Sequence, residues 1–205
     1  KRAPTPSVLL ASLKQVRPTA MLSVPLIIEK IYKSSIAPTI KKSKFLTFLQ
    51  KSMPVVLHLL IGFKLKKTFG GRLKFFGIGG SKLDPTVEAF LKKTGFPYAI
   101  GYGLTETAPL ICAAPPRKTK VGSTGRQVPG IQVELRGVNP ETGEGEICVK
   151  GPIVMLGYYK DYERTKNVLS QDGWLRTGDL ACVDAKGRYS VKGRMGTLIL
   201  GASGE

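Results

Sequence analysis

Long apolar runs are lacking in this sequence, and cysteine is rare. No stretch approaches the ~18 apolar residues of a membrane-spanning helix, because the longest apolar segment, residues 53–65, is interrupted by a histidine and a lysine. The three cysteines, Cys112, Cys148 and Cys182, are too scattered for a disulfide framework or a CxxC metal pair. We therefore expect a cytoplasmic protein in a reducing compartment.

Acidic residues are scarce in the first half of the chain. Residues 1–98 contain 18 Lys and Arg but 3 Asp and Glu, whereas residues 99–205 contain 14 and 11, so +15 of the formal charge of +18 lies in the first half. Such an excess is typical of proteins that bind a polyanion or an anionic membrane, although a solvated lysine-rich face produces it too. Because RNP-like interleaving of aromatic and basic residues is lacking, no nucleic-acid partner is expected. The sequence gives no indication of an oligomeric state.

The remaining composition is that of a folded protein. The chain has 205 residues, 42% of them hydrophobic and 22% charged, which allows one large or two small domains and excludes a collagenous, coiled-coil or wholly disordered chain. It begins Lys-Arg-Ala-Pro, without an initiator methionine or a signal-peptide pattern. We expect a piece of a longer polypeptide.

The first seventy residues read mainly as helices. Residues 8–33 predict a helix, a short strand and a second helix, separated by prolines. Residues 36–67 have a helical period with lysines beside the apolar positions. One interpretation is an amphipathic region on an anionic membrane. The other, which such patterns more often reflect, is a pair of core-packed helices whose lysines face water.

Two different sheets are predicted further on. RLKFFGI at 72–78 and PYAIGYG at 97–103 read as parallel strands around a helix at 85–94, with Asp84 as its N-cap. Ligands bind beyond the carboxyl ends of such strands, so the loops that follow them should border one crevice. Four short alternating segments then predict antiparallel strands, at 131–137, 145–151, 179–184 and 187–193, with one helix at 162–169 between them.

Five polar residues carry the candidate chemistry. In GYGLTET, Tyr102 offers a flat face for a purine, Thr105 a hydroxyl for a phosphate oxygen, and Glu106 a hard carboxylate for Mg²⁺. Asp179 is suited to accept hydrogen bonds from two ribose hydroxyls, and Arg194 to reach a sugar or phosphate. Taken singly, each also fits a structural role: a strand end, a turn aspartate bonded to its own backbone, or a surface arginine.

Together these segments resemble the adenylate-forming (AMP-binding) superfamily, which includes acyl-CoA synthetases, firefly luciferase and nonribosomal-peptide adenylation domains. The resemblance covers nearly the whole chain. Two segments, RPTAMLSVPLIIEKIY and the terminal ILGASGE, resemble long-chain fatty acyl-CoA synthetases in particular. The colinear motifs are GG at 79–80, YGLTE at 102–106, GEICVKGPIVMLGYY at 145–159, WLRTGD at 174–179 and KGR at 192–194.

The resemblance implies an α/β fold, the later part of an adenylate-forming N-terminal domain. Residues 1–125 would form part of an α/β subdomain with parallel strands, 126–193 an antiparallel, β-barrel-like subdomain, and 194–205 the hinge and the start of the C-terminal lid. The implied enzyme is a long-chain fatty acid–CoA ligase. A fatty acid attacks the α-phosphate of ATP to give acyl-AMP and pyrophosphate, and coenzyme A then takes the acyl group, releasing AMP. Mg²⁺ would be required.

Residue roles follow from the matching motifs. Thr105 would bind the α-phosphate and Glu106 the Mg²⁺, which makes them the implied catalytic pair. Tyr102 would stack on adenine, Asp179 would hold the ribose hydroxyls, and Arg194 would contact the ribose. The implied loops around the nucleotide contain Gly79, Gly80, Ser81, Gly101 and Gly103.

The sequence also departs from the family pattern. The family's Ser/Thr/Gly-rich phosphate loop is not found, since GSTG at 122–125 leads into a strand instead. The lid with its catalytic lysine is not found either, and Gly196 stands where the hinge normally carries Asp or Lys. We therefore expect this chain alone to be nearly inactive, with unpaired strands in its sheet. The alternatives are an enzyme for another carboxylic acid and a non-catalytic basic module that binds membrane or nucleic acid.

Overall fold

The computed structural model describes residues 6–195 and divides the chain into two compact units. The first comprises the chain up to Ala99 together with Pro115–Val121, and the second comprises Ile100–Ala114 together with the chain from Gly122 onward. The domain boundary expected near residue 125 stays a prediction. Most of the expected hinge, Gly196 included, lies outside the described residues.

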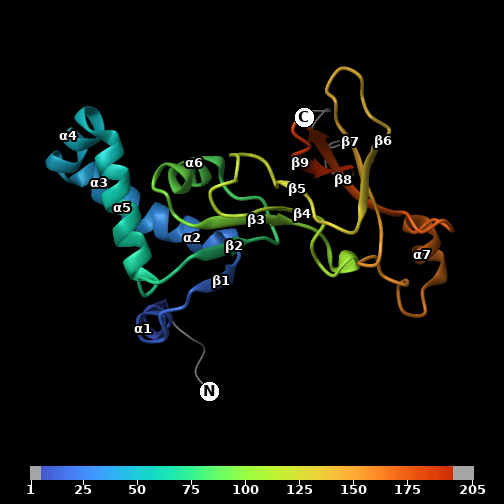
Figure 1. Cartoon of the computed structure of the whole chain (residues 1–205), viewed down its shortest axis with the longest axis horizontal. Coiled ribbons are helices and arrows are strands. Elements are labelled where there is room, and N and C mark those ends of the chain that lie inside the picture. Colours follow the sequence, from blue (N-terminus) through green and yellow to red (C-terminus); the bar gives the residue numbers. More distant parts are fainter. Residues whose placement is uncertain (1–5, 196–205) are drawn as a thin grey trace, which may run out of the picture. The chain divides into compact units, whose positions relative to one another are not determined.

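The first unit is predominantly helical, and the helix–strand–helix order predicted for residues 8–33 is confirmed (Figure 1). The region predicted as helical at 36–67 forms three helices, which follow a π-helical turn. The elements are α1 (Pro6–Val16), β1 (Ala20–Ser23), α2 (Pro25–Ile31), the π-helix η1 (Tyr32–Ile36), α3 (Ala37–Lys42), α4 (Lys44–Ser52), α5 (Pro54–Thr68), β2 (Phe75–Ile78) and α6 (Pro85–Lys93).

The strands of the first unit form one edge of a sheet. β1 pairs in parallel with β2, and β3 (Tyr98–Tyr102) begins beside β2, where the Phe76 N–H donates to the Pro97 carbonyl at 2.8 Å. Between β2 and β3 runs α6, whose predicted N-cap is confirmed because Asp84 accepts hydrogen bonds from the N–H groups of Thr86 and Val87. β1 is the edge strand.

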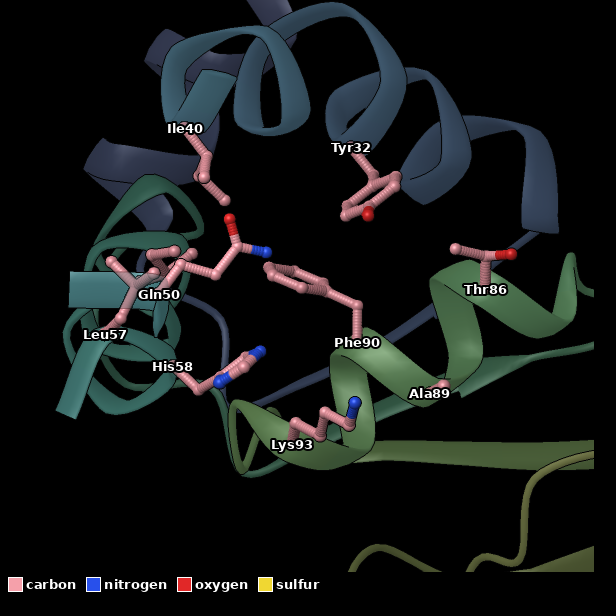
Figure 2. A pocket seen from close by; sticks show the side chains of 10 residues that line it. Tyr32, Ile40, Gln50, Leu57, His58, Thr86, Ala89, Phe90 and Lys93 are labelled. Atoms are coloured by element: carbon pink, nitrogen blue, oxygen red, sulfur yellow. The ribbon is translucent and has the colours of Figure 1, made fainter. Parts of the chain in front are cut away.

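Helix α6 faces α4 and α5 across a small pocket (Figure 2). The Phe90 ring points from α6 into this space, with its centroid 4.8 Å from that of Tyr32 and 6.2 Å from that of His58. The cavity volume of about 200 Å³ is below the range of about 300–1,000 Å³ usual for small-molecule sites. We therefore describe it as an imperfectly filled helix interface.

Gly62 of α5 sets how closely α5 approaches the end of α6. A Cβ at this position would lie 2.1 Å from the carbonyl oxygen of Thr94, and a backbone atom cannot move aside cheaply. We expect Gly62→Ala to destabilise the chain by about 1–2 kcal/mol, because overpacking of about 1–3 kcal/mol outweighs the gain in helix propensity of at most about 1 kcal/mol. Urea denaturation measures this change.

Gly193→Ala is the matched control, since a Cβ at Gly193 would meet no atom within 4 Å and the position has no positive φ. We expect its denaturation midpoint to stay near that of the unaltered chain. Equal stability of the Gly62→Ala and Gly193→Ala chains would contradict the close approach of α5 and α6.

The second unit consists mainly of antiparallel strands. The remainder of β3 pairs with β4, which pairs with β5, and a separate antiparallel sheet has the order β6-β7-β8-β9. This confirms the predicted fold class. The elements are the 3₁₀ turn η2 (Thr105–Thr107), β4 (Cys112–Ala114), β5 (Arg126–Gln127), β6 (Gln132–Arg136), β7 (Gly145–Lys150), α7 (Tyr162–Val168), β8 (Leu175–Val183) and β9 (Tyr189–Arg194).

Candidate functional site

Asp179 lies in a β-bulge of β8, where the three residues 177–179 face the single residue Ile147 of β7. Gly178 adopts φ +71° there, a conformation that favours glycine. The sequence predicts a turn before a strand that begins at 179. The strand instead begins at Leu175, because pairing with β7 continues on both sides of the bulge. Bulges commonly re-aim a side chain in this way.

A buried glutamate, Glu146 of β7, holds the bulge in place. Its Oε1 accepts a hydrogen bond from the Gly178 N–H at 3.1 Å, and its Oε2 accepts one from Arg176 Nε at 2.9 Å. The Thr177 hydroxyl donates to the facing β7 carbonyl at 2.8 Å and accepts from the Asp179 N–H at 3.1 Å. The sequence analysis assigned no role to Glu146. An acidic residue directly before the apolar run ICV could have indicated a buried carboxylate with a structural partner.

The Asp179 carboxylate is bound by two other predicted site residues. Its Oδ2 accepts from the Tyr102 hydroxyl at 2.8 Å and its Oδ1 from Arg194 Nε at 3.1 Å. Both partners are side chains distant in sequence, which distinguishes Asp179 from a turn aspartate bonded to its own backbone. Burial raises the pKa of the Tyr102 phenol, so this hydroxyl stays protonated and remains a donor at neutral pH.

Glu106 is held by a residue that sequence reasoning missed. Its Oε1 accepts from the Tyr158 hydroxyl at 2.8 Å, and the guanidinium carbon of Arg164 lies 4.3 Å from the centroid of the Tyr158 ring. The pKa of Glu106 is lowered most by a hydrogen bond from its own backbone N–H, and further by the Tyr158 hydroxyl and by the charges of Arg194 and Arg164. Its carboxylate is therefore ionised at neutral pH. Tyr158 stands in the quoted segment GEICVKGPIVMLGYY, but spacing alone did not connect it to Glu106.

The glycines on either side of Tyr102 are required by close contacts with the residues that follow in the same loop. A Cβ at Gly101 would lie 2.8 Å from the Leu110 side chain, and one at Gly103 would lie 1.8 Å from the Pro109 carbonyl oxygen. Thr105, at the start of η2, is exposed. The roles predicted for these residues toward a nucleotide stay predictions.

The structure places the remaining predicted residues in the first unit. Gly79, Gly80 and Ser81 form the loop between β2 and α6, and Gly80 adopts φ +88°. The second unit thus brings together Tyr102 with Asp179 and Arg194, and Glu106 with Tyr158, and Arg194 lies close enough for its charge to act on Glu106 as well. The expectation that the loops after β2 and β3 border one crevice stays a prediction.

Residues 6–195 contain neither an acidic or thiol-rich metal cluster nor a membrane-spanning helix. Within this range, no three or more His, Cys, Asp or Glu side chains gather to form a metal cluster. No helix in the same range is long and apolar enough to cross a membrane. Among these residues, Glu106 therefore belongs to no cluster of three or more metal-binding side chains.

Comparison with known proteins identifies the family. Residues 1–159 match the sequence profile of the family described as AMP-binding enzyme. This is most of the chain, and the chain therefore belongs to that family, as predicted.

Several curated proteins resemble the chain. Long chain acyl-CoA synthetase 7, peroxisomal, of Arabidopsis thaliana is 35% identical over 216 residues, 93% of this chain and 30% of that protein. Probable 4-coumarate–CoA ligase 1 of Dictyostelium discoideum is 32% identical over 87% of this chain and 35% of that protein. The chain thus spans about a third of the length of these relatives.

Solved structures support the fold. The amide bond synthetase McbA of Marinactinospora thermotolerans has a TM-score of 0.68 at 26% identity, and the match covers 94% of this chain and 35% of that one. O-succinylbenzoate coenzyme A synthetase of Bacillus subtilis, solved in complex with AMP, has a TM-score of 0.66 at 22% identity over 93% of this chain and 34% of that one. The second likeness shows the fold alone.

Proposed function

We propose that the chain is part of an ATP-dependent acyl-CoA synthetase that activates a long-chain fatty acid. The fatty carboxylate attacks the α-phosphate of ATP and displaces pyrophosphate, and the coenzyme A thiol then attacks the acyl carbon of acyl-AMP and displaces AMP. The observation that carries the proposal is the bulge-mounted Asp179, whose carboxylate is oriented by Tyr102 and Arg194. Membership of the AMP-binding enzyme family supports the same nucleotide.

The remaining acceptor positions of the Asp179 carboxylate fit the two hydroxyls of a ribose. Each of its two oxygens accepts one described hydrogen bond, and an ionised carboxylate offers about four acceptor positions. The Asp179 side chain is 8% exposed, whereas that of Arg194 is 67% exposed. The two ribose hydroxyls would approach the carboxylate from the exposed side of Arg194, where this arginine would contact the ribose, while Tyr102 fixes the carboxylate.

Glu106 fits a hard cation. Its carboxylate is ionised and bound through Oε1 to Tyr158, and Mg²⁺ usually takes only one or two protein carboxylates and completes its shell with water and phosphate oxygens. When bound, Mg²⁺ neutralises phosphate charge. The chain's own contribution is to hold Glu106 ionised and oriented and to offer the exposed Thr105 hydroxyl next to it.

The nucleotide role of Asp179 is tested by its replacement with asparagine. We expect Asp179→Asn to weaken AMP binding by about tenfold to a hundredfold, because each hydrogen bond to a charged group contributes about 1.5–3 kcal/mol. Isothermal titration of the chain with AMP measures the affinity. Asp172→Asn, which changes an acidic residue outside the candidate site, should leave it unaltered. Unchanged binding in the Asp179 variant would make Asp179 a purely structural residue.

The proposal also specifies which class of carboxylic acid is the substrate. The relatives named long-chain acyl-CoA synthetases favour a fatty acid, whereas the relative named a 4-coumarate–CoA ligase favours an aryl acid. Acid-dependent exchange of pyrophosphate into ATP, measured on the longest chain that the gene encodes, distinguishes them. We expect turnover with long-chain acids, and a preference for aryl acids would replace the first substrate class by the second.

The location of the protein also remains a prediction. The cysteine pattern predicts the cytoplasm, whereas two Arabidopsis relatives carry the word peroxisomal in their names. Fluorescence of a tagged chain beside a peroxisomal marker in its own cells separates these two compartments.

A further inference from the structure

Helix α5 is apolar on both of its long faces. One face packs inside the first unit, where Leu57 and Leu65 are 1% and 4% exposed. The opposite face is uncovered among the described residues, and Leu59 and Phe63 on it are 59% and 71% exposed. A helix that is apolar all round is normally covered all round, so this second face requires an occupant.

Helix α4, which contacts α5, also carries exposed apolar side chains, Phe45 and Phe48. Figure 1 shows α3, α4 and α5 as neighbours in the first unit. Single exposed apolar side chains are ordinary, but a group of seven on two adjoining helices marks a binding surface. We call this group the outer face: Phe45, Phe48, Val55, Val56, Leu59, Leu60 and Phe63, each between 38% and 71% exposed.

The segment that carries the outer face has charged residues of one sign. Residues 30–83 contain twelve Lys and Arg and not a single Asp or Glu. Lys33 pairs with Asp84, but in residues 6–195 none of the lysines of α3, α4 and α5 forms an ion pair. These lysines are Lys41, Lys42, Lys44, Lys51, Lys64, Lys66 and Lys67.

We propose that the outer face docks onto an anionic lipid surface. Apolar and aromatic side chains with lysines at their margin match the boundary between acyl chains and anionic headgroups. A second copy of the chain would bring the two basic surfaces together, and repulsion between them opposes that occupant. The tertiary structure explains why α5 has no polar side: its inner face completes the core, and its outer face enters the lipid.

Flotation of the purified chain with vesicles tests the proposal. We expect binding to phosphatidylcholine vesicles that contain about a third phosphatidylglycerol, weaker binding to pure phosphatidylcholine, and release by salt, which screens lysine–headgroup attraction. Neutralisation in Lys64→Gln/Lys67→Gln should weaken binding about thirtyfold, since each lysine near the surface contributes about 1 kcal/mol. The control Lys118→Gln/Lys186→Gln changes two exposed lysines elsewhere and should bind like the unaltered chain.

A second set of variants tests the contribution of the apolar side chains to vesicle binding. Leu59→Ser/Phe63→Ser should weaken vesicle binding by on the order of a hundredfold, because burial of each such side chain contributes at least about 1.5 kcal/mol. Leu22→Ser, which removes an even more exposed leucine from β1, should leave vesicle binding unchanged. Circular dichroism establishes that each variant is folded.

A fluorescent reporter keeps the test decisive if the serine variants do not fold. Leu59→Trp adds one tryptophan to Trp174, the single natural one, and its emission should shift to the blue and be quenched by brominated lipid. Leu22→Trp should show neither effect.

Four results would overturn the proposal. They are equal binding to neutral and anionic vesicles, no quenching of Leu59→Trp, binding of an oligonucleotide in place of vesicles with the same lysine dependence, and a dimer in ultracentrifugation that Leu59→Ser/Phe63→Ser dissociates. A fifth result would also overturn it. If the longest chain that the gene encodes does not bind vesicles although this chain does, the rest of that longer chain covers the outer face. None of these results bears on nucleotide binding, so the two proposals stand or fall separately.

Discussion

Replacement of Glu106 by glutamine should abolish most acyl-AMP formation while leaving the fold intact. The substitution keeps the size of the side chain and a carbonyl oxygen that accepts from Tyr158, but it removes the charge that would hold Mg²⁺ against the phosphates. Loss of one preorganised electrostatic group typically costs about a hundredfold to a thousandfold in rate. Pyrophosphate exchange in the longest chain that the gene encodes measures this loss, and raised Mg²⁺ should restore part of the rate.

The second half-reaction provides an internal control for Glu106. Thioester formation from supplied acyl-AMP involves no pyrophosphate leaving group, so Glu106→Gln should affect it much less. An equal loss in both half-reactions, or an unfolded variant, would make Glu106 a structural residue.

Tyr158→Phe tests the positioning of Glu106 separately from its charge. The Tyr158 hydroxyl stabilises the ionised carboxylate and thereby lowers the pKa of Glu106. Its removal raises that pKa, so Glu106 is protonated at higher pH than before. We expect the acidic limb of the rate–pH profile to move toward higher pH, with a smaller rate loss at neutral pH than in Glu106→Gln. An unmoved acidic limb would show that Tyr158 does not act through Glu106.

The second large effect is expected at Glu146. Glu146→Ala leaves the half-buried Gly178 N–H without its acceptor and Arg176 without its partner, and hydrogen bonds to charged groups contribute about 1.5–3 kcal/mol each. Arg176 is 54% exposed and regains water, so we expect a net loss of about 2–3 kcal/mol in the free energy of unfolding. Because the bulge then loses its support, AMP affinity should fall as well.

Glu134→Ala is the matched control for Glu146→Ala. Glu134 lies on the neighbouring strand β6 and pairs with Arg136, but both side chains are more than 40% exposed. Exposed ion pairs contribute little to stability, so urea denaturation should show a small change and AMP titration none. Equal effects of the two alanine variants would contradict the role of Glu146 in holding Asp179.

Local sequence signals were sufficient for most elements of this protein. Asp84 followed by Pro85 predicts the start of α6, because a side-chain acceptor satisfies the first free N–H groups and proline suits the first helical position. The alternating segments of the second unit predict its strands for an equally local reason. The family motifs were readable without a fold, since the resemblance depends on residue type and order.

Only the tertiary structure decided which side chains meet. Tyr102 and Asp179 are 77 positions apart, and their contact depends on the bulge in β8 that Glu146 stabilises. No periodicity encodes that bulge, because it results from the register between two strands. The role of α5 likewise required the fold, since an apolar helix with lysines at its end fits both a core and a membrane until its neighbours show which face is already covered. Local residue patterns thus determined the elements and the family, whereas strand register and helix packing determined the site contacts and the outer face.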